Sequence, residues 1–281
     1  MRSDDVFIHG ILPRSGTNYL SRVLRCHDDL EASPRSMWEF PHLRKSDPLV
    51  SYAASMARSR KLPELEERDV LRIVGDAWLA WAAKGLPDEQ RLVLKEPSVR
   101  NLDRFFRFFP RSYLLVLVRD GRDIACSSLR ADFAAPPRFH PLRPRSWRRG
   151  FVRPIEALAR RWAAASGQIR AFLDTPEARE RARVVRFEDL VRDPERELDA
   201  ILTFLGLPPE RFHWESFASL GVRGSSFVGD REGTVDWTDR SPAGFDPVGR
   251  WRAWSARDVR RFGAVASAEL ERWGYESGES A

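Results

Sequence analysis

The sequence predicts an α/β fold built on a doubly wound parallel sheet, and three observations support this. Four short apolar runs, at residues 6–9, 92–94, 113–118 and 183–187, lack the polar alternation of strands with one solvated face. Helical patterns stand between these runs, as they do in βαβ units. The chain has 281 residues, of which 42% are hydrophobic and 31% charged, so we expect a single domain over residues 1–281.

The helices are predicted by apolar residues that recur at spacings of three and four. We expect helices over residues 18–26, 64–83, 155–173, 193–205 and 256–273. The clearest of them is DPERELDAILTFLG, in which Asp193 is the N-cap and Pro194 the first helical residue. Gly206 ends this helix.

Three segments interrupt the alternation of strands and helices. They are rich in Pro, Arg, Gly, Ser or Trp and lie at residues 31–50, 130–154 and 221–254. Long loops in a compact α/β domain are usually functional, so we expect loops or lids there. Ligands of such sheets bind beyond the carboxyl ends of the strands, which residues 10–19 and 119–128 follow directly.

Composition limits the classes of function. The formal net charge of +6 suits an anionic ligand, while the basic residues are scattered along the chain, so we do not expect nucleic-acid binding. Two cysteines are too few for a disulfide framework or a zinc site. The N-terminus lacks an apolar signal region and no stretch approaches the length of a transmembrane helix, so we expect a cytoplasmic protein.

The stretch HGILPRSGTNYL, between the first apolar run and the first helix, has the composition of a phosphate-binding loop. The backbone N–H groups that we expect to converge on an anion are those of Ser15, Gly16, Thr17 and Asn18. Arg14 adds positive charge. The loop departs from G-x-x-x-x-G-K-[ST] and has no lysine, which disfavours a Mg-dependent kinase-like nucleotide enzyme without removing it as an alternative.

A second anion site is predicted after residues 113–118. The stretch VRDGRDIACSSL places Arg119 at a strand end and Ser127 eight residues later on the next helix. Both side chains can face one cleft, and arginine can hold a phosphate with two hydrogen bonds. The alternative is that Arg119 pairs with Asp120 or Asp123 at the surface.

These motifs resemble those of sulfotransferases that use 3′-phosphoadenosine 5′-phosphosulfate (PAPS). PRSGTNYL is similar to the family's 5′-phosphosulfate loop, and Arg119 and Ser127 match its 3′-phosphate clamp. VVRFEDLVRDPERELDAILTFLGL resembles a strand and helix of the family's P-loop-like fold. The Arg-Lys-Gly triplet of the phenol and steroid enzymes is absent, so the resemblance is closer to the bacterial, glycan and tyrosylprotein members.

The resemblance extends in order over roughly residues 6–254 and implies further roles. Family members close a serine-containing loop and a basic residue over the nucleotide, and the matching residues are Ser225, Ser226 and Arg250. Tyr19 stands where a family aromatic can stack on adenine.

The reaction implied by the resemblance is sulfuryl transfer from PAPS to an acceptor hydroxyl, with adenosine 3′,5′-bisphosphate (PAP) as product and no metal. Arg14 and Lys95 would interact with the transferred sulfuryl group. We expect a sugar or glycan acceptor before a natural product, and a peptide tyrosine third. A non-catalytic PAP-binding protein is the other alternative.

An acceptor hydroxyl needs a general base. Some family members have a histidine two residues after the lysine, but Pro97 holds that place here. Others use a glutamate in the loop after the first helix, where Glu39 is our candidate. Its rivals are Glu31, His42 and Glu96.

Overall fold

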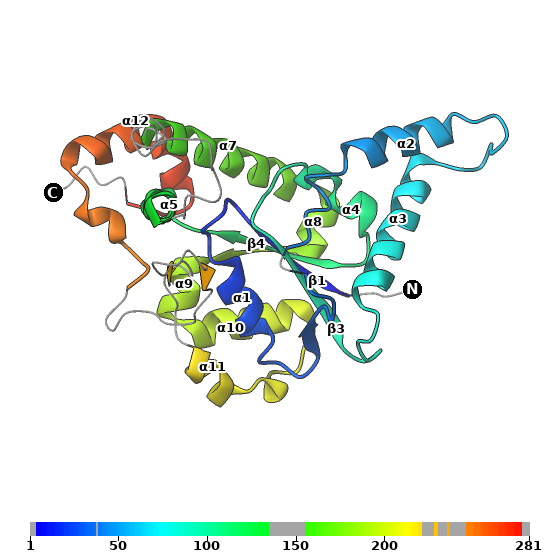
Figure 1. Cartoon of the computed structure of the whole chain (residues 1–281), viewed down its shortest axis with the longest axis horizontal. Coiled ribbons are helices and arrows are strands. Elements are labelled where there is room, and N and C mark those ends of the chain that lie inside the picture. The colour runs from blue at the N-terminus through cyan, green and yellow to red at the C-terminus, as the bar shows by residue number, and fades with distance from the viewer. Residues whose placement is uncertain are drawn as a thin grey trace.

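The computed structural model describes residues 4–37, 39–134, 155–220, 228–229, 235–236 and 246–276, with a five-stranded sheet at its centre (Figure 1). The strands of this sheet are β1 (Val6–Gly10), β2 (Leu30–Ala32), β3 (Arg91–Glu96), β4 (Tyr113–Val118) and β5 (Ala182–Arg186). Their order is β2-β3-β1-β4-β5, and every neighbouring pair is parallel. The predicted α/β fold with a parallel sheet is confirmed.

Helices account for most of the other described residues. The α-helices are α1 (Thr17–Leu24), α2 (Asp47–Ala57), α3 (Glu67–Ala82), α4 (Phe105–Phe108), α5 (Gly121–Ala134), α7 (Ile155–Leu173), α8 (Pro176–Arg181), α9 (Phe187–Arg192), α10 (Pro194–Leu205), α11 (Trp214–Leu220) and α12 (Ala256–Arg272). The shorter elements are the 3₁₀ turns η1 (Leu102–Arg104), η3 (Pro209–Arg211) and η4 (Arg250–Ala253) and the antiparallel pair β6 (Val228–Gly229) and β7 (Val235–Asp236). Within the described ranges, no helix has the length and apolarity that crossing a membrane requires.

Both faces of the sheet are buried, which explains why its strands lack polar alternation. On β4, Val116 belongs to a core shared with α3, α7 and α12, while Leu115 and Leu117 face a second core shared with α1 and α10. Figure 1 shows α7 and α12 on one side of the sheet and α1 and α10 on the other.

The position of β1 determines where a ligand can bind. β1 lies between β3 and β4 in the sheet. The chain passes from β1 to β2 and β3 on one side of it, and then crosses to β4 and β5 on the other side. A crevice forms at such a switch point, beyond the carboxyl ends of the strands. The loop between β1 and α1 begins there.

The four predicted strands and the five predicted helices are all observed, with ends that differ by a few residues. β2 and the helices α2, α4, α8, α9 and α11 were not predicted. Residues 31–50 are not a continuous loop, because β2 ends inside them and α2 begins at Asp47 with Pro48 in its first turn. At 130–154, α5 continues to Ala134, and η4 lies within 221–254. Most of the last two segments lies outside the described residues.

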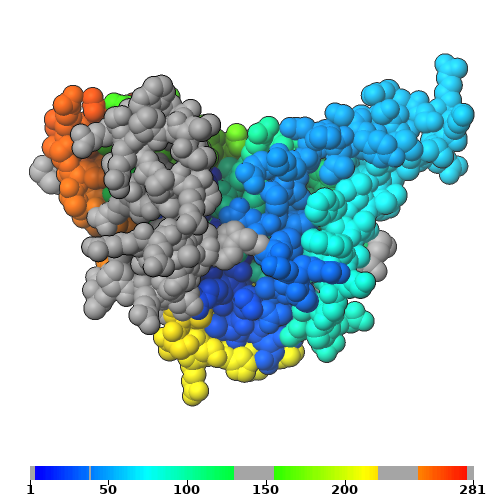
Figure 2. All heavy atoms as spheres, in the orientation of Figure 1, coloured from blue at the N-terminus to red at the C-terminus, as the bar shows by residue number. Residues whose placement is uncertain are grey.

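α2 and α3 form a helical hairpin that projects at the upper right of Figure 2. Ala53 is the single buried residue of α2, whereas α3 contributes Val70, Leu71 and Leu79 to the core. The hairpin is therefore attached to the body of the domain mainly through α3.

Two glycines inside helices should respond oppositely to alanine. An added Cβ at Gly75 in α3 would overlap the carbonyl oxygen of Phe108, whereas Gly167 in α7 has open space at that point. Helix propensity favours alanine by about 1 kcal/mol at both positions. We expect Gly167→Ala to raise the free energy of unfolding by up to that amount and Gly75→Ala to lower it by about 1–3 kcal/mol. Urea unfolding of both variants measures the difference, and equal effects would contradict the close packing of α3 on Phe108.

Candidate active site

The loop between β1 and α1 has a fixed, strained backbone. The Ile11 N–H donates to the Leu117 carbonyl at 2.9 Å, which ties the start of the loop to β4. Arg14 and Gly16 have φ angles of 78° and 102°, in the left-handed region. A Cβ at Gly16 would lie 2.5 Å from the Phe187 ring, so only glycine fits there.

The N-terminus of α1 is open to an anion. Gly16 is the N-cap and provides no side-chain hydrogen bond, so the N–H groups of the first turn, from Thr17 onward, can bind an anion. Ser15 differs from our expectation, because its N–H donates to the Leu12 carbonyl at 3.2 Å within the loop. Its hydroxyl is fully buried and lacks a hydrogen-bond partner among the described residues. Asn18 is half-buried beside the helix start.

The two predicted anion-binding motifs meet in the structure. Arg14 Nε donates a hydrogen bond to the Ser127 hydroxyl at 3.0 Å. Arg119 Nη1 donates to the Arg14 carbonyl at 2.8 Å. These contacts join residues more than one hundred positions apart, and they place the loop after β1 beside the loop after β4.

Arg119 is held from several sides. Its Nη2 donates to the Pro247 carbonyl at 2.6 Å, and its guanidinium carbon lies 4.4 Å from the centre of the Phe187 ring. The Trp162 indole N–H donates to the Arg119 carbonyl at 3.0 Å. Because the side chain is 6% exposed, its position is fixed before any ligand binds.

Three arginines raise the positive potential at this junction. Burial lowers the pKa of Arg14, and the charges of Arg119 and Arg250 lower it further. Such mutual repulsion is relieved when an anion binds among the guanidinium groups. Ser225 and Ser226, which we expected to join this site, lie outside the described residues.

The aspartates that could have neutralised Arg119 at the surface have other partners. Asp120 pairs with Arg122 at 2.8 Å, and Arg122 in turn lies 3.6 Å from the centre of the Trp251 ring. Asp123 accepts a hydrogen bond from the Trp251 backbone N–H at 3.1 Å. Arg119 is buried, so it does not form a surface ion pair. Burial lowers the pKa of its guanidinium, and the charges of Asp123 and Asp120 oppose this shift.

Glu39 and Lys95 lie together beside the end of β3. The Phe40 N–H donates to the Lys95 carbonyl at 3.0 Å, which fixes the chain next to Glu39 against the strand. Burial lowers the pKa of Lys95, and the charge of Glu39 opposes this shift. The carboxylate therefore lies close enough to the lysine to stabilise its charge.

Glu31 is separated from Lys95 along the sheet. It lies on β2 opposite Leu92, three residues before Lys95, which corresponds to about 10 Å along the strand. Arg25 holds its carboxylate at 2.6 Å. The register thus favours Glu39 over Glu31 as the residue near the lysine.

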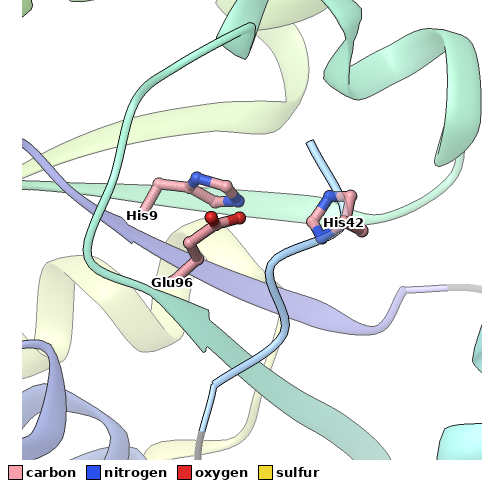
Figure 3. Close-up of side chains that lie close together, drawn as sticks. All are labelled: His9, His42 and Glu96. Atoms are coloured by element: carbon pink, nitrogen blue, oxygen red, sulfur yellow. The ribbon is translucent and has the colours of Figure 1, made fainter. Parts of the chain in front are cut away.

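The other two rivals of Glu39 are buried. Glu96 is 2% exposed and His42 7%, and Figure 3 shows both side chains facing His9. Burial raises the pKa of Glu96 to about 7, although the nearby Arg44 opposes the shift. Neither group is open to an acceptor. His9 was not among the predicted site residues, because only the pairing of β1 with β3 brings it opposite Glu96.

Phe187 is the neighbour shared by several candidate residues. Its ring lies 6.2 Å from that of Tyr19, and it also covers Gly16 and Arg119. Burial raises the pKa of Tyr19 to about 12. The stacking of Tyr19 on adenine stays a prediction. From the sequence, the segment of Phe187 was expected to be only architectural, whereas its ring packs against Gly16 and Arg119.

Comparison with known proteins bears on the family and the fold of the chain. The chain is 24% identical over 280 residues to protein-tyrosine sulfotransferase 1 of Danio rerio, covering 96% of this chain and 72% of that protein. The sulfotransferase domain of the Synechococcus PCC 7002 olefin synthase has a similar structure, with a TM-score of 0.55, 19% identity and coverage of 98% of this chain and 97% of that one. A mouse sulfotransferase complexed with PAP gives a TM-score of 0.53 at 13% identity, covering 96% and 84% of the two chains.

At these identities the two solved structures show the fold alone. The family itself is shown by the sequence, because residues 5–211 match the sulfotransferase family and make up well over half of the chain. The chain therefore belongs to the sulfotransferase family.

Proposed function

We propose that this protein transfers the sulfuryl group of PAPS to an acceptor hydroxyl. The observation that carries the proposal is the junction of Arg14, Ser127 and Arg119, where the loop after β1 meets the end of β4 and the helix α5. PAPS has two separate anionic groups, and this junction has donors from two separate motifs. The PAP bound to the mouse relative supports the same class of ligand.

The donors divide between the two ends of the nucleotide. The N–H groups at the start of α1 and the Arg14 guanidinium would hold the 5′-phosphosulfate. Arg119, Ser127 and Arg250 would hold the 3′-phosphate. The hydrogen bond between Arg14 and Ser127 couples the two ends, so that binding the 3′-phosphate also orients the loop at the reacting end.

The transfer itself is an in-line displacement. Glu39 accepts the proton of the acceptor hydroxyl while its oxygen forms a bond to sulfur. The bond from sulfur to the 5′-phosphate oxygen breaks, and PAP leaves with the electron pair. Lys95 and Arg14 stabilise the negative charge that develops on the sulfuryl and bridging oxygens.

The proposal does not specify which class of molecule supplies the acceptor hydroxyl. Hydroxyls of a sugar, a natural product or a peptide tyrosine all fit the same displacement. Protein tyrosine gains support from the name of the Danio rerio relative, and a natural product from the olefin synthase domain. An acceptor screen with labelled PAPS should therefore include all three.

Nucleotide binding provides the first test. PAP at 100 times its Kd should stabilise the protein by about 2.7 kcal/mol, visible as a rise in Tm, whereas ATP with Mg²⁺ should give a much smaller shift. Arg14→Ala serves as the control, and at the same PAP concentration it should reduce the stabilisation to about half or less. A shift with ATP and Mg²⁺ alone would contradict PAPS binding and favour a kinase-like enzyme. A shift with PAP but no transfer to any acceptor class would favour a non-catalytic PAP-binding protein.

A further inference from the structure

Three side chains that the proposed transfer does not use meet inside the domain, next to the site. His9 comes from β1, Glu96 from the end of β3, and His42 from the turn that follows Phe40 (Figure 3). The register of β1 with β3 places His9 directly opposite Glu96. One ligand atom from each of the three residues lies within 4.8 Å of the others. All three are buried, with exposures of 1%, 2% and 7% for His9, Glu96 and His42.

The hydrogen bonds of the two imidazoles determine which nitrogen faces the cluster. His9 Nδ1 lies 2.7 Å from the Ser98 carbonyl, and His42 Nδ1 lies 3.0 Å from the Phe40 carbonyl. A carbonyl can only accept, so each Nδ1 carries the proton and each Nε2 presents a lone pair. Backbone carbonyls fix metal-binding histidines in this same tautomer.

The cluster consists of acceptors that lack donors. Both Nε2 atoms and both oxygens of Glu96 are buried without a hydrogen-bond partner among the described residues. The half-exposed Arg44 approaches one Glu96 oxygen at 3.4 Å and compensates part of the carboxylate charge. A proton on Glu96 could serve one imidazole but would leave the other unpaired. A cation in the centre satisfies all three groups at once.

We propose that His9, His42 and Glu96 form a binding site for a divalent transition-metal ion, with Zn²⁺ the best match. Two imidazoles and one carboxylate are a common Zn²⁺ ligand set, and they leave a fourth position for water. Ligands of a tetrahedral Zn²⁺ ion with bonds of about 2.0–2.1 Å lie about 3.3 Å apart, so the side chains would close by up to about 1.5 Å.

The surroundings suit a structural ion. The Phe7 ring lies 5.3 Å from the His42 ring and the Phe109 ring 4.7 Å from it, while Phe105 lies 6.0 Å from His9. These rings exclude bulk water from the cluster, so the fourth ligand would be a single enclosed water molecule.

The ion would connect the segment that carries Glu39 to the sheet. His42 is three residues after Glu39, while the other two ligands belong to β1 and β3. Metal binding would therefore position the proposed general base without taking part in the transfer. This positioning role depends on the proposed function, whereas the metal site itself does not.

The test measures metal binding by the full-length chain in the absence of nucleotide. The protein is stripped with a chelator, desalted, loaded with Co²⁺ or Zn²⁺ and desalted again. We expect one equivalent of metal per chain and, for Co²⁺, the d–d absorption of a four-coordinate ion with nitrogen and oxygen ligands. Glu96→Gln, His9→Gln and His42→Gln should each weaken binding at least tenfold.

His27→Gln is the matched control, because His27 is equally buried but its ring nitrogens are paired with Pro208 and Asp29. This variant should bind cobalt like the wild type. Failure of the wild type to retain stoichiometric metal, or equal binding by Glu96→Gln, would overturn the site. If the histidine variants do not fold, the nearly isosteric Glu96→Gln variant tests the metal site on its own. The stabilisation of the protein by PAP is measured separately and tests the proposed function. The metal site and the proposed function can therefore be contradicted independently of each other.

Discussion

Glu39→Gln is expected to lower kcat for sulfuryl transfer by about 10²–10⁴-fold while PAP binds with unchanged affinity. The amide keeps the shape of the side chain but cannot accept the acceptor's proton. Glu39 lies beside Lys95 through the Phe40–Lys95 hydrogen bond and is not part of the arginine junction that would hold the nucleotide. Steady-state rates with labelled PAPS give kcat, and calorimetry gives the Kd of PAP.

Glu31→Gln is the matched control for this experiment. Glu31 comes from the same stretch of chain, but it lies on β2 and pairs with Arg25. It should keep a kcat within a few-fold of wild type. If Glu39→Gln is as active as Glu31→Gln, another group takes the proton. Loss of PAP binding by Glu39→Gln would instead mean that the substitution disturbs the nucleotide site.

Arg14→Ala is expected to have an effect of similar size, but on binding as well as on rate. The side chain makes the hydrogen bond that connects the two phosphate-binding motifs and carries one of the three charges at the junction. Loss of one or two charge-assisted hydrogen bonds costs about 1.5–3 kcal/mol each, so the Kd of PAP should rise by roughly 10–100-fold or more. Because the same guanidinium would face the leaving group, kcat should fall too.

Two further variants separate charge from conformation at this position. Arg14→Gly also removes the guanidinium but accepts the positive φ of 78° without strain, so it should bind PAP as weakly as Arg14→Ala while unfolding at a higher temperature. Arg25→Ala removes one positive charge from a half-exposed surface pair and should leave PAP affinity nearly unchanged. Equal loss of affinity in Arg14→Ala and Arg25→Ala would show that net charge alone attracts the nucleotide.

Strong local signals explain why the main elements were predictable. α10 begins after the Asp193 cap, continues with Pro194 and ends at Gly206, as its sequence indicates. The central strands are continuous apolar runs because helices cover both faces of the sheet. β2 was missed because it is a three-residue edge strand with a single buried side chain. α2 was missed altogether, in part because Pro48 was read as a loop residue, whereas proline is also favoured in a first helical turn.

The separate motifs of the candidate site could be predicted from the sequence, but the contacts between these motifs could not. The sequence and the family resemblance predicted anion binding by Arg14 and by Arg119 with Ser127, with the pairing of Arg119 to an aspartate as the alternative. The Arg14–Ser127 hydrogen bond depends on β1 and β4 being neighbours, which is a property of the sheet order. The same holds for His9 and Glu96, whose meeting depends on the β1–β3 register. Local patterns cannot encode pairings between residues so far apart in the chain.

Arg119 is held by a residue that comes much later in the sequence, and this affects the order in which the protein can fold during its synthesis. All five strands of the main sheet and the whole stretch that matches the family precede residue 212. The Pro247 carbonyl that holds Arg119, and the Gly249 and Trp251 N–H groups that bond to Asp123, come later. The strands of the sheet are therefore synthesised before the residues that hold Arg119 and Asp123. A truncated translation product ending after the matched stretch would still bear the family's signature, yet it would lack the backbone groups that bond to these two side chains.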